Sequence, residues 1–129
     1  YMPNLARHTV AELPFDKQKL KTASIVSDDN GREYLLNITA FPKELDNLPV
    51  KDIFNFALKL LMPNEDYILI DYKPSSEIAD FKIVMKTGAE TKRGRMTFKN
   101  GFLFLQMVTS TEANFFKDDY GKFIESLKL

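Results

Sequence analysis

The chain contains no cysteine and no tryptophan, and its only histidine is His8. The absence of thiols excludes disulfide bonds, thiolate metal sites, iron–sulfur clusters and cysteine nucleophiles. A single imidazole near one end does not suggest a histidine-rich metal site or a Ser-His-Asp relay, so we expect His8 to lie on the surface or on a strand edge. Carboxylates are then the only obvious groups for acid–base chemistry.

An excess of charge of one sign is also missing, because 18 basic and 18 acidic residues give a net charge of zero. Nucleic-acid-binding domains usually have a strongly basic footprint, so we expect no nucleic-acid partner. No apolar run exceeds four residues, far below the ~20 residues of a spanning helix, so we expect no transmembrane segment. The 129 residues, 44% of them apolar, fit a single domain over residues 1–129, with residues 1–7 as a flexible lead.

The start of the chain bears on its compartment. It begins with Tyr1, and residues 1–7 lack the apolar stretch of a signal peptide. We therefore expect that a leader, with or without a lipid anchor, has been removed. The lack of cysteine is compatible with an oxidising space, so we expect an extracytoplasmic domain, in the periplasm or anchored to the membrane as a lipoprotein. A cytoplasmic location is the alternative.

Alternating apolar residues and turn signals predict seven strands. Two Asn-Gly pairs, at residues 30–31 and 100–101, are typical of tight hairpins. The strands are expected at residues 8–13, 20–27, 32–41, 66–72, 81–86, 92–99 and 101–110.

Helical spacing of apolar residues predicts two helices, one from Val50 to just before Pro63 and one over residues 116–127. Asn47 or its neighbour is expected to cap the first helix. Both faces of the strand at residues 101–110 are apolar, which predicts a layer above and below the sheet. The predicted fold class is α+β, with an antiparallel sheet of about six to seven strands in the order βββ-α-ββββ-α between two helices. The most buried residues are expected to be Phe54, Ala57, Leu61, Leu103, Leu105, Met107, Phe116, Phe123 and Leu127.

Two groups of charged residues are candidates for function. The first is an acidic segment, in which burial could separate the pKa values of paired carboxylates for hydrolytic acid–base work. We expect these side chains instead to be ordinary solvated carboxylates at strand ends. They are Glu65, Asp66, Asp71, Glu77 and Asp80.

The second group is basic. Residues 82–99 carry six basic side chains and only one acidic side chain, Glu90. If the two strands in this region pair across the turn at residues 87–91, four of the cations can share one face. This face is a candidate docking site for an acidic partner, and a solvated hairpin that protects the sheet is the alternative. The candidate docking residues are Lys82, Lys86, Arg93 and Arg95.

The C-terminal third resembles the ending of PsbP-like domains. The resemblance rests on the charged hairpin with Gly94, the strand GFLFLQMVTS and the closing segment KFIESLKL. In the family's closing F-x-x-S-[FL]-k-[LVI] pattern, the matching positions here are Phe123, Ser126, Leu127 and Leu129. The resemblance implies an α-β-α sandwich and an accessory or binding role, in a family that includes photosystem subunits and bacterial lipoproteins. It brings no catalytic motif to this chain.

We assign no catalytic, cofactor-binding or metal-binding residue, since the chain contains no phosphate-binding glycine motif and no nucleophile elbow. The leading hypothesis is a non-enzymatic accessory or interaction domain that binds a protein or a component of the cell envelope. The alternative is a small-ligand-binding or carboxylate-dependent hydrolase domain with a pocket on its sheet, of the nuclear-transport-factor or cystatin type.

Overall fold

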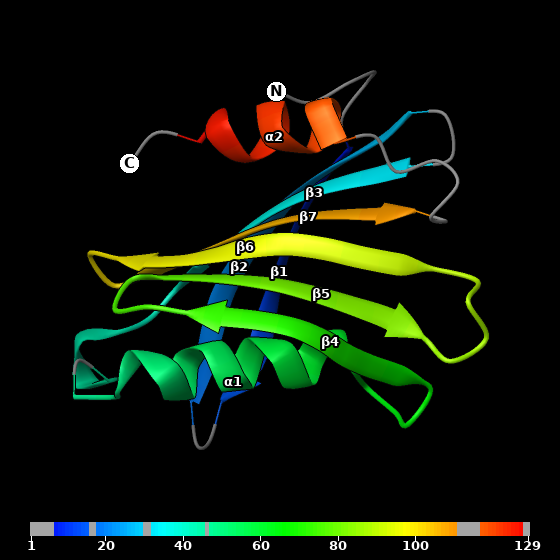
Figure 1. Ribbon diagram of the computed structural model, residues 1–129. Helices are drawn as coiled ribbons and strands as arrows, with labels where there is room; N and C mark the ends of the chain where they lie inside the picture. Colours follow the sequence, from blue (N-terminus) through cyan, green and yellow to red (C-terminus); the bar gives the residue numbers. More distant parts are fainter. Residues whose placement is uncertain (1–6, 16–17, 30–31, 46, 111–116, 128–129) are drawn as a thin grey trace.

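The computed structural model describes residues 7–15, 18–29, 32–45, 47–110 and 117–127. Within these residues the chain forms seven strands and two α-helices, with one short 3-10 helix (Figure 1). The strands are β1 (Arg7–Phe15), β2 (Gln18–Asp29), β3 (Arg32–Ala40), β4 (Tyr67–Pro74), β5 (Ile78–Met85), β6 (Thr91–Lys99) and β7 (Phe102–Ser110). The helices are α1 (Val50–Leu61), α2 (Lys117–Glu125) and the 3-10 helix Lys43–Leu45.

All seven strands belong to one sheet in the order β1-β2-β3-β7-β6-β5-β4, and every neighbouring pair is antiparallel. The first three strands form one meander and the last four form another, and the β3–β7 ladder joins them. The predicted α+β class, the antiparallel sheet and the element order are therefore confirmed, and the fold is dominated by its sheet. Arg7 already belongs to β1 rather than to a flexible lead, and residues 1–6 lie outside the described residues.

A tight turn explains the β6–β7 hairpin. Asn100 and Gly101, between β6 and β7, have φ of 54° and 81°. Two successive positive φ values are what a two-residue hairpin turn of the primed type needs, and Asn-Gly tolerates them best. The other Asn-Gly pair lies outside the described residues, but Asp29 and Arg32 on either side of it are paired in the β2–β3 ladder.

Helix α1 has the predicted extent, but its start differs from the prediction. Its N-cap is Pro49, and no side chain caps it, so the expectation for Asn47 is wrong. The Pro49 carbonyl instead accepts the N–H groups of Asp52 and Ile53. Asp52 also places a negative charge in the first turn, which the helix dipole favours.

The two helices contact opposite sides of the sheet. On the side that we call the α1 side, Ile53 and Phe54 of α1 belong to the main core with alternate residues of the strands, such as Ile83 and Leu105. On the α2 side, α2 contributes to a smaller core of four buried residues. Its members are Tyr34, Val108, Phe123 and Ile124.

Six of the nine residues expected in the core are buried: Phe54, Ala57, Leu103, Leu105, Met107 and Phe123. Leu61 and Leu127 are only half-buried, which corrects the prediction. Leu61 is the last residue of α1 and Leu127 lies beyond the end of α2, so neither is covered on all sides. Phe116 lies outside the described residues.

Gly94 in the middle of β6 is required by a close approach. A Cβ atom at this position would collide with the backbone oxygen of Gln106 and would lie 2.7 Å from the Cζ atom of Phe81. Both neighbours belong to the packed centre of the sheet, where Gly94 faces Phe81 and Met107. A side chain at residue 94 therefore cannot be accommodated without moving backbone.

We predict that Gly94→Ala lowers the free energy of unfolding by about 1–3 kcal/mol, because overpacking in a close-packed interior forces strain. The matched control is Gly121→Ala, since no atom lies within 4 Å of a Cβ built at that helical glycine. Removing a glycine from a helix interior should raise stability by roughly 0.5–1 kcal/mol. Urea denaturation of both variants measures the two effects, and equal changes would contradict the role of Gly94.

We predict that Phe123→Ala destabilises the protein by about 3–5 kcal/mol. Phe123 is 2% exposed and packs edge-on against Tyr34, with ring centroids 5.3 Å apart. Phe102→Ala is the control, since Phe102 is 43% exposed. If thermal unfolding shows that Phe123→Ala melts like the parent, α2 does not close the core.

Candidate functional site

The basic hairpin brings three of the four predicted cations to one face. β5 and β6 pair so that Lys82 lies opposite Arg93 and Asp80 lies opposite Arg95. The side chains of directly opposed residues point to the same side of a sheet, so these cations share the α2 side. Lys86 does not belong to this face, because β5 ends at Met85 and residue 86 lies in the turn.

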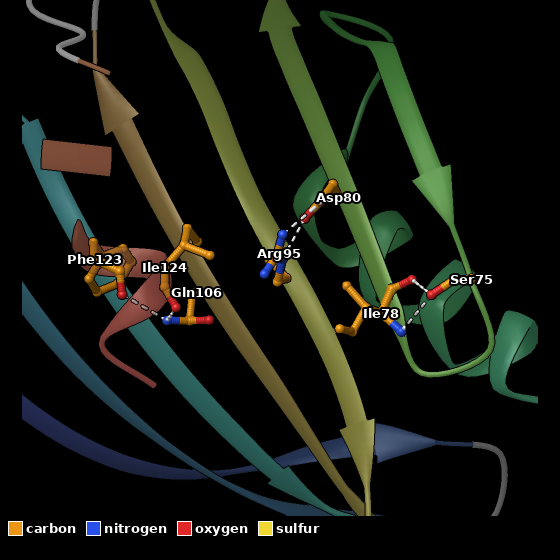
Figure 2. Close-up of polar contacts among 7 residues, drawn as sticks. All are labelled: Ser75, Ile78, Asp80, Arg95, Gln106, Phe123 and Ile124. Carbon is orange, nitrogen blue, oxygen red and sulfur yellow. Dashed lines mark hydrogen bonds and ion pairs between the residues drawn. The ribbon is translucent and has the colours of Figure 1, made fainter. Parts of the chain in front are cut away.

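Arg95 is paired within the hairpin. Its Nε donates to Asp80 Oδ1 at 2.7 Å and its NH2 group to Oδ2 at 3.2 Å (Figure 2). This bidentate hydrogen bond raises the pKa of the Arg95 guanidinium. Asp80, from the acidic segment, therefore neutralises the charge of Arg95, from the basic hairpin. The sequence pattern did not predict this ion pair.

Arg93 contacts α2. Its guanidinium lies 4.2 Å from the ring centroid of Tyr120, a cation–π geometry. Burial raises the pKa of Tyr120 to about 12, and the nearby positive charge of Arg93 opposes that shift. Part of the predicted docking patch thus serves to hold α2 on the sheet.

The buried side chain of Gln106 also holds α2. The last carbonyl groups of a helix lack partners within the helix. Gln106 Nε2 donates to the carbonyls of Phe123 and Ile124 at 2.9 and 3.1 Å (Figure 2). This cap from the centre of β7 fixes where α2 ends on the sheet, and no sequence pattern indicated it.

The acidic segment does not form an enclosed acid–base pair. Glu65, Asp66, Asp71 and Glu77 are exposed, and Asp80 is half-buried against Arg95. Asp71 lies opposite Lys82 in the β4–β5 ladder, and its Oδ2 lies 4.0 Å from Lys73 Nζ. Glu65, Asp66 and Glu77 lie in turns and bends, as expected, whereas Asp71 and Asp80 lie within β4 and β5 and are paired in their ladders, which corrects the expectation for these two residues.

On the α2 side of the sheet, the side chains of β7 become more exposed from Val108 to Phe102. Going down this side of the strand, Val108 is 2% exposed and Gln106 3%, Phe104 is half-buried, and Phe102 is 43% exposed. On the other side of the same strand Leu103 and Leu105 are buried by the α1 core. Helix α2 therefore covers only one end of its side of the sheet, consistent with its position over β3 and β7 in Figure 1.

The part of this side of the sheet that α2 leaves uncovered extends across β1, β2, β3 and β7. The registers place its side chains in adjacent rows, and all of them are half-buried or exposed. We call this surface the open face; it consists of Val10, Ala23, Ile25, Leu36, Ile38, Ala40, Phe102 and Phe104.

Cations flank the end of the open face that lies farthest from α2. Lys21 lies opposite Ala40, Lys99 lies opposite Phe102, and Lys19 is two residues from Lys21 on the same side. All three lysines are exposed, and Glu12 lies opposite Lys21. A hollow of about 460 Å³ opens here, lined by Lys19, Lys21, Ala40, Phe41 and Pro42.

A second hollow, of about 380 Å³, lies at the opposite end of the strands. Its lining combines three carboxylates with the buried Arg32 and with Ser110, whose buried Oγ has no hydrogen-bond partner. The lining residues are Asp28, Arg32, Glu33, Ala89, Glu90, Thr109 and Ser110. Among the residues that the structure describes, no group of three acidic or histidine side chains is arranged to hold a metal ion.

His8 lies in β1, at the edge of the sheet, where it pairs with Ile25. This backbone position agrees with the expected strand edge.

No family model matches the chain, and no curated protein matches its sequence.

We predict that Tyr120→Phe changes the alkaline pH dependence of stability. A tyrosine whose folded pKa lies near 12 instead of 10.0 remains neutral when the unfolded chain ionises, so the free energy of unfolding falls as the pH rises from 10 to 12. The Phe variant lacks this ionisation and should lose less stability over that range. Denaturant unfolding at several pH values tests this, and identical slopes for the parent and the variant would contradict it.

Proposed function

We propose that this chain is a non-enzymatic interaction domain that binds a protein partner on its open face. The observation that carries the proposal is the gradient of exposure along β7, from 2% at Val108 to 43% at Phe102. Soluble proteins rarely expose a contiguous apolar surface without a binding role. The open face also lies on rigid, paired strands, so a partner would bind without first ordering it.

The charges around the open face define the chemistry of the partner. Lys19, Lys21 and Lys99 flank one end, and the hairpin cations lie on the same side of the sheet, on β5 and β6. A complementary partner presents an apolar element with acidic side chains beside it, and these charges steer its approach. This extends the docking hypothesis for Lys82, Arg93 and Arg95. Arg95 is paired with Asp80 and Arg93 contacts Tyr120 of α2, so this group is a flank of the surface instead of its centre.

A hydrolase that uses the acidic segment has less support. Catalytic acid–base work by carboxylates needs burial or close charges to set their pKa values. Four of the five carboxylates are exposed, and the fifth is held by Arg95. The described residues that line the hollow beside Lys19 and Lys21 include no carboxylate.

We also propose that the domain is PsbP-like and extracytoplasmic. The element order, with the helices on opposite sides of one antiparallel sheet, supports the α-β-α sandwich that this family resemblance implies. No described helix is long and apolar enough to cross a membrane. Fractionation of cells that express the full-length gene product tests the proposed compartment.

Site-specific photocrosslinking in the native cell tests the binding surface. A photoreactive benzoylphenylalanine replaces Phe102 on the open face or Leu60 on α1, which are 43% and 50% exposed on opposite sides of the sheet. We expect a discrete protein adduct from residue 102 and none from residue 60. Equal labelling at the two positions, or none at residue 102, would remove the open face from consideration.

The partner identified in this way allows a quantitative prediction. Phe102→Ser should weaken binding of the purified proteins at least about tenfold, as expected for a central aromatic contact, while Leu60→Ser leaves binding unchanged. The double variant Lys21→Glu/Lys99→Glu should slow association and reduce its salt dependence.

Binding to anionic lipid vesicles in place of a protein would assign the face to the cell envelope. Hydrolytic turnover lost in Asp71→Asn or Asp80→Asn would instead favour the enzymatic alternative.

A further inference from the structure

Among the residues that the structure describes, the sheet ends at two edge strands, β1 and β4, and they differ in their protection. An edge strand offers unpaired N–H and C=O groups to another strand, and natural proteins block such edges with bulges, charges and proline. β4 has all three: its register shifts between Leu69 and Asp71, Asp71 and Lys73 are exposed, and Pro74 ends the strand. This edge is blocked.

β1 has Glu12 and Pro14 near its C-terminal end, but no bulge, charge or proline at residues 9–11. Its nine residues pair with β2 without any shift of register. The central residues Thr9, Val10 and Ala11 are exposed and uncharged, and Glu12 follows them. Val10 is 84% exposed, the highest value among the large hydrophobic side chains that the structure describes as exposed.

We propose that β1 pairs with β1 of a second copy of this chain, antiparallel, about a two-fold axis at Val10. This inference is independent of the proposed partner on the open face. The identical strand is a suitable occupant because an antiparallel pair of one strand with itself forms a closed, two-fold dimer. It also continues the antiparallel order of the sheet.

The sequence of β1 selects the register. Directly opposed residues must point to the same side of the combined sheet, so the two residue numbers in each pair must have an even sum. Centring on Val10 pairs Thr9 with Ala11 and His8 with Glu12, each twice by symmetry. By sequence, a histidine and a glutamate are then opposed at two places, and the exposed apolar side chain of Val10 meets its copy on the axis.

The neighbouring registers fit less well. Centring on Ala11 would place Glu12 opposite Val10 and would bring Pro14, which has no N–H to donate, into the ladder. Centring on Thr9 would place the exposed apolar Val10 opposite His8 and would separate the two Val10 side chains. In the Val10 register, the described residues 7–13 pair among themselves without Pro14.

The two-fold axis of the dimer would be perpendicular to the sheet, and such a rotation leaves each side of the sheet on the same side. The two open faces would therefore lie on the same side of one continuous sheet. Val10 belongs to both the edge and the open face. Its burial in the dimer therefore leaves the remaining open-face residues, such as Phe102 and Phe104, available on each copy.

Sedimentation equilibrium of the purified 129-residue chain tests the proposal, from about 10 µM to about 1 mM because small interfaces are weak. We expect a monomer–dimer equilibrium. Val10→Glu places two like charges on the axis and should weaken dimerisation at least about tenfold, with an unchanged circular dichroism spectrum. Ile70→Glu, at a 51% exposed position on β4, should dimerise like the parent. A monomer at every concentration, or a dimer lost in Ile70→Glu and kept in Val10→Glu, overturns the proposal.

A crosslinking experiment does not depend on the tolerance of β1 for a charge. The chain has no cysteine, so Val10→Cys introduces a single thiol. Opposed residues in antiparallel strands have Cα atoms about 4.5–5.5 Å apart, which is within the range of a disulfide bond. Mild oxidation should link Val10→Cys into a covalent dimer but leave Ile70→Cys largely monomeric. Equal linking of the two variants contradicts pairing through β1.

The register has its own test. His8→Glu and Glu12→His should each weaken the dimer, because each places like residues opposite one another. The double exchange His8→Glu/Glu12→His should restore the parent's dimerisation, as only the Val10-centred register pairs these two positions. Failure of the double variant to recover contradicts the register.

Discussion

The pairing of β3 with β7 is the interaction on which the remainder of the structure depends. It joins two meanders that are separate in the sequence, since residues 33–40 pair with residues 102–109. Part of β7 consequently becomes interior on both sides: Leu103 and Leu105 belong to the core on the α1 side, and Gln106 and Val108 lie under α2, whereas Phe102 stays exposed. The absence of a side chain at Gly94 lets β6 and Phe81 approach the same strand. Without this ladder, neither helix would have a complete sheet to cover.

The two helices cover the sheet unequally, and this inequality produces the candidate surface. α1 has twelve residues and belongs to the main core, whereas α2 has nine and buries a small cluster. The Gln106 cap and the Arg93–Tyr120 contact hold α2 at one end of its side. The apolar side chains at the other end keep partial exposure, and a partner that buries them gains the hydrophobic free energy that α2 does not.

Charged residues show how far the sequence predicts a site. Alternation along two paired strands correctly placed Lys82 and Arg93 on one side, because a regular hairpin fixes which residues oppose each other. It misplaced Lys86, since the end of β5 depends on where the ladder stops. It did not indicate that Arg95 is paired with Asp80, because the two residues lie on different strands and only the β5–β6 register brings them opposite each other.

The sequence by itself determined the seven strands, both helices, their order and most of the core, because hydrophobic period and turn residues are local properties. Only the tertiary structure decided which strands became edges, how far α2 covers its side, and why Gln106 is buried. Each of these depends on residues brought together by the β3–β7 ladder. Local sequence patterns do not tell which distant residues will cover a strand. The exposure of Phe102 and Val10 therefore follows only from the tertiary structure.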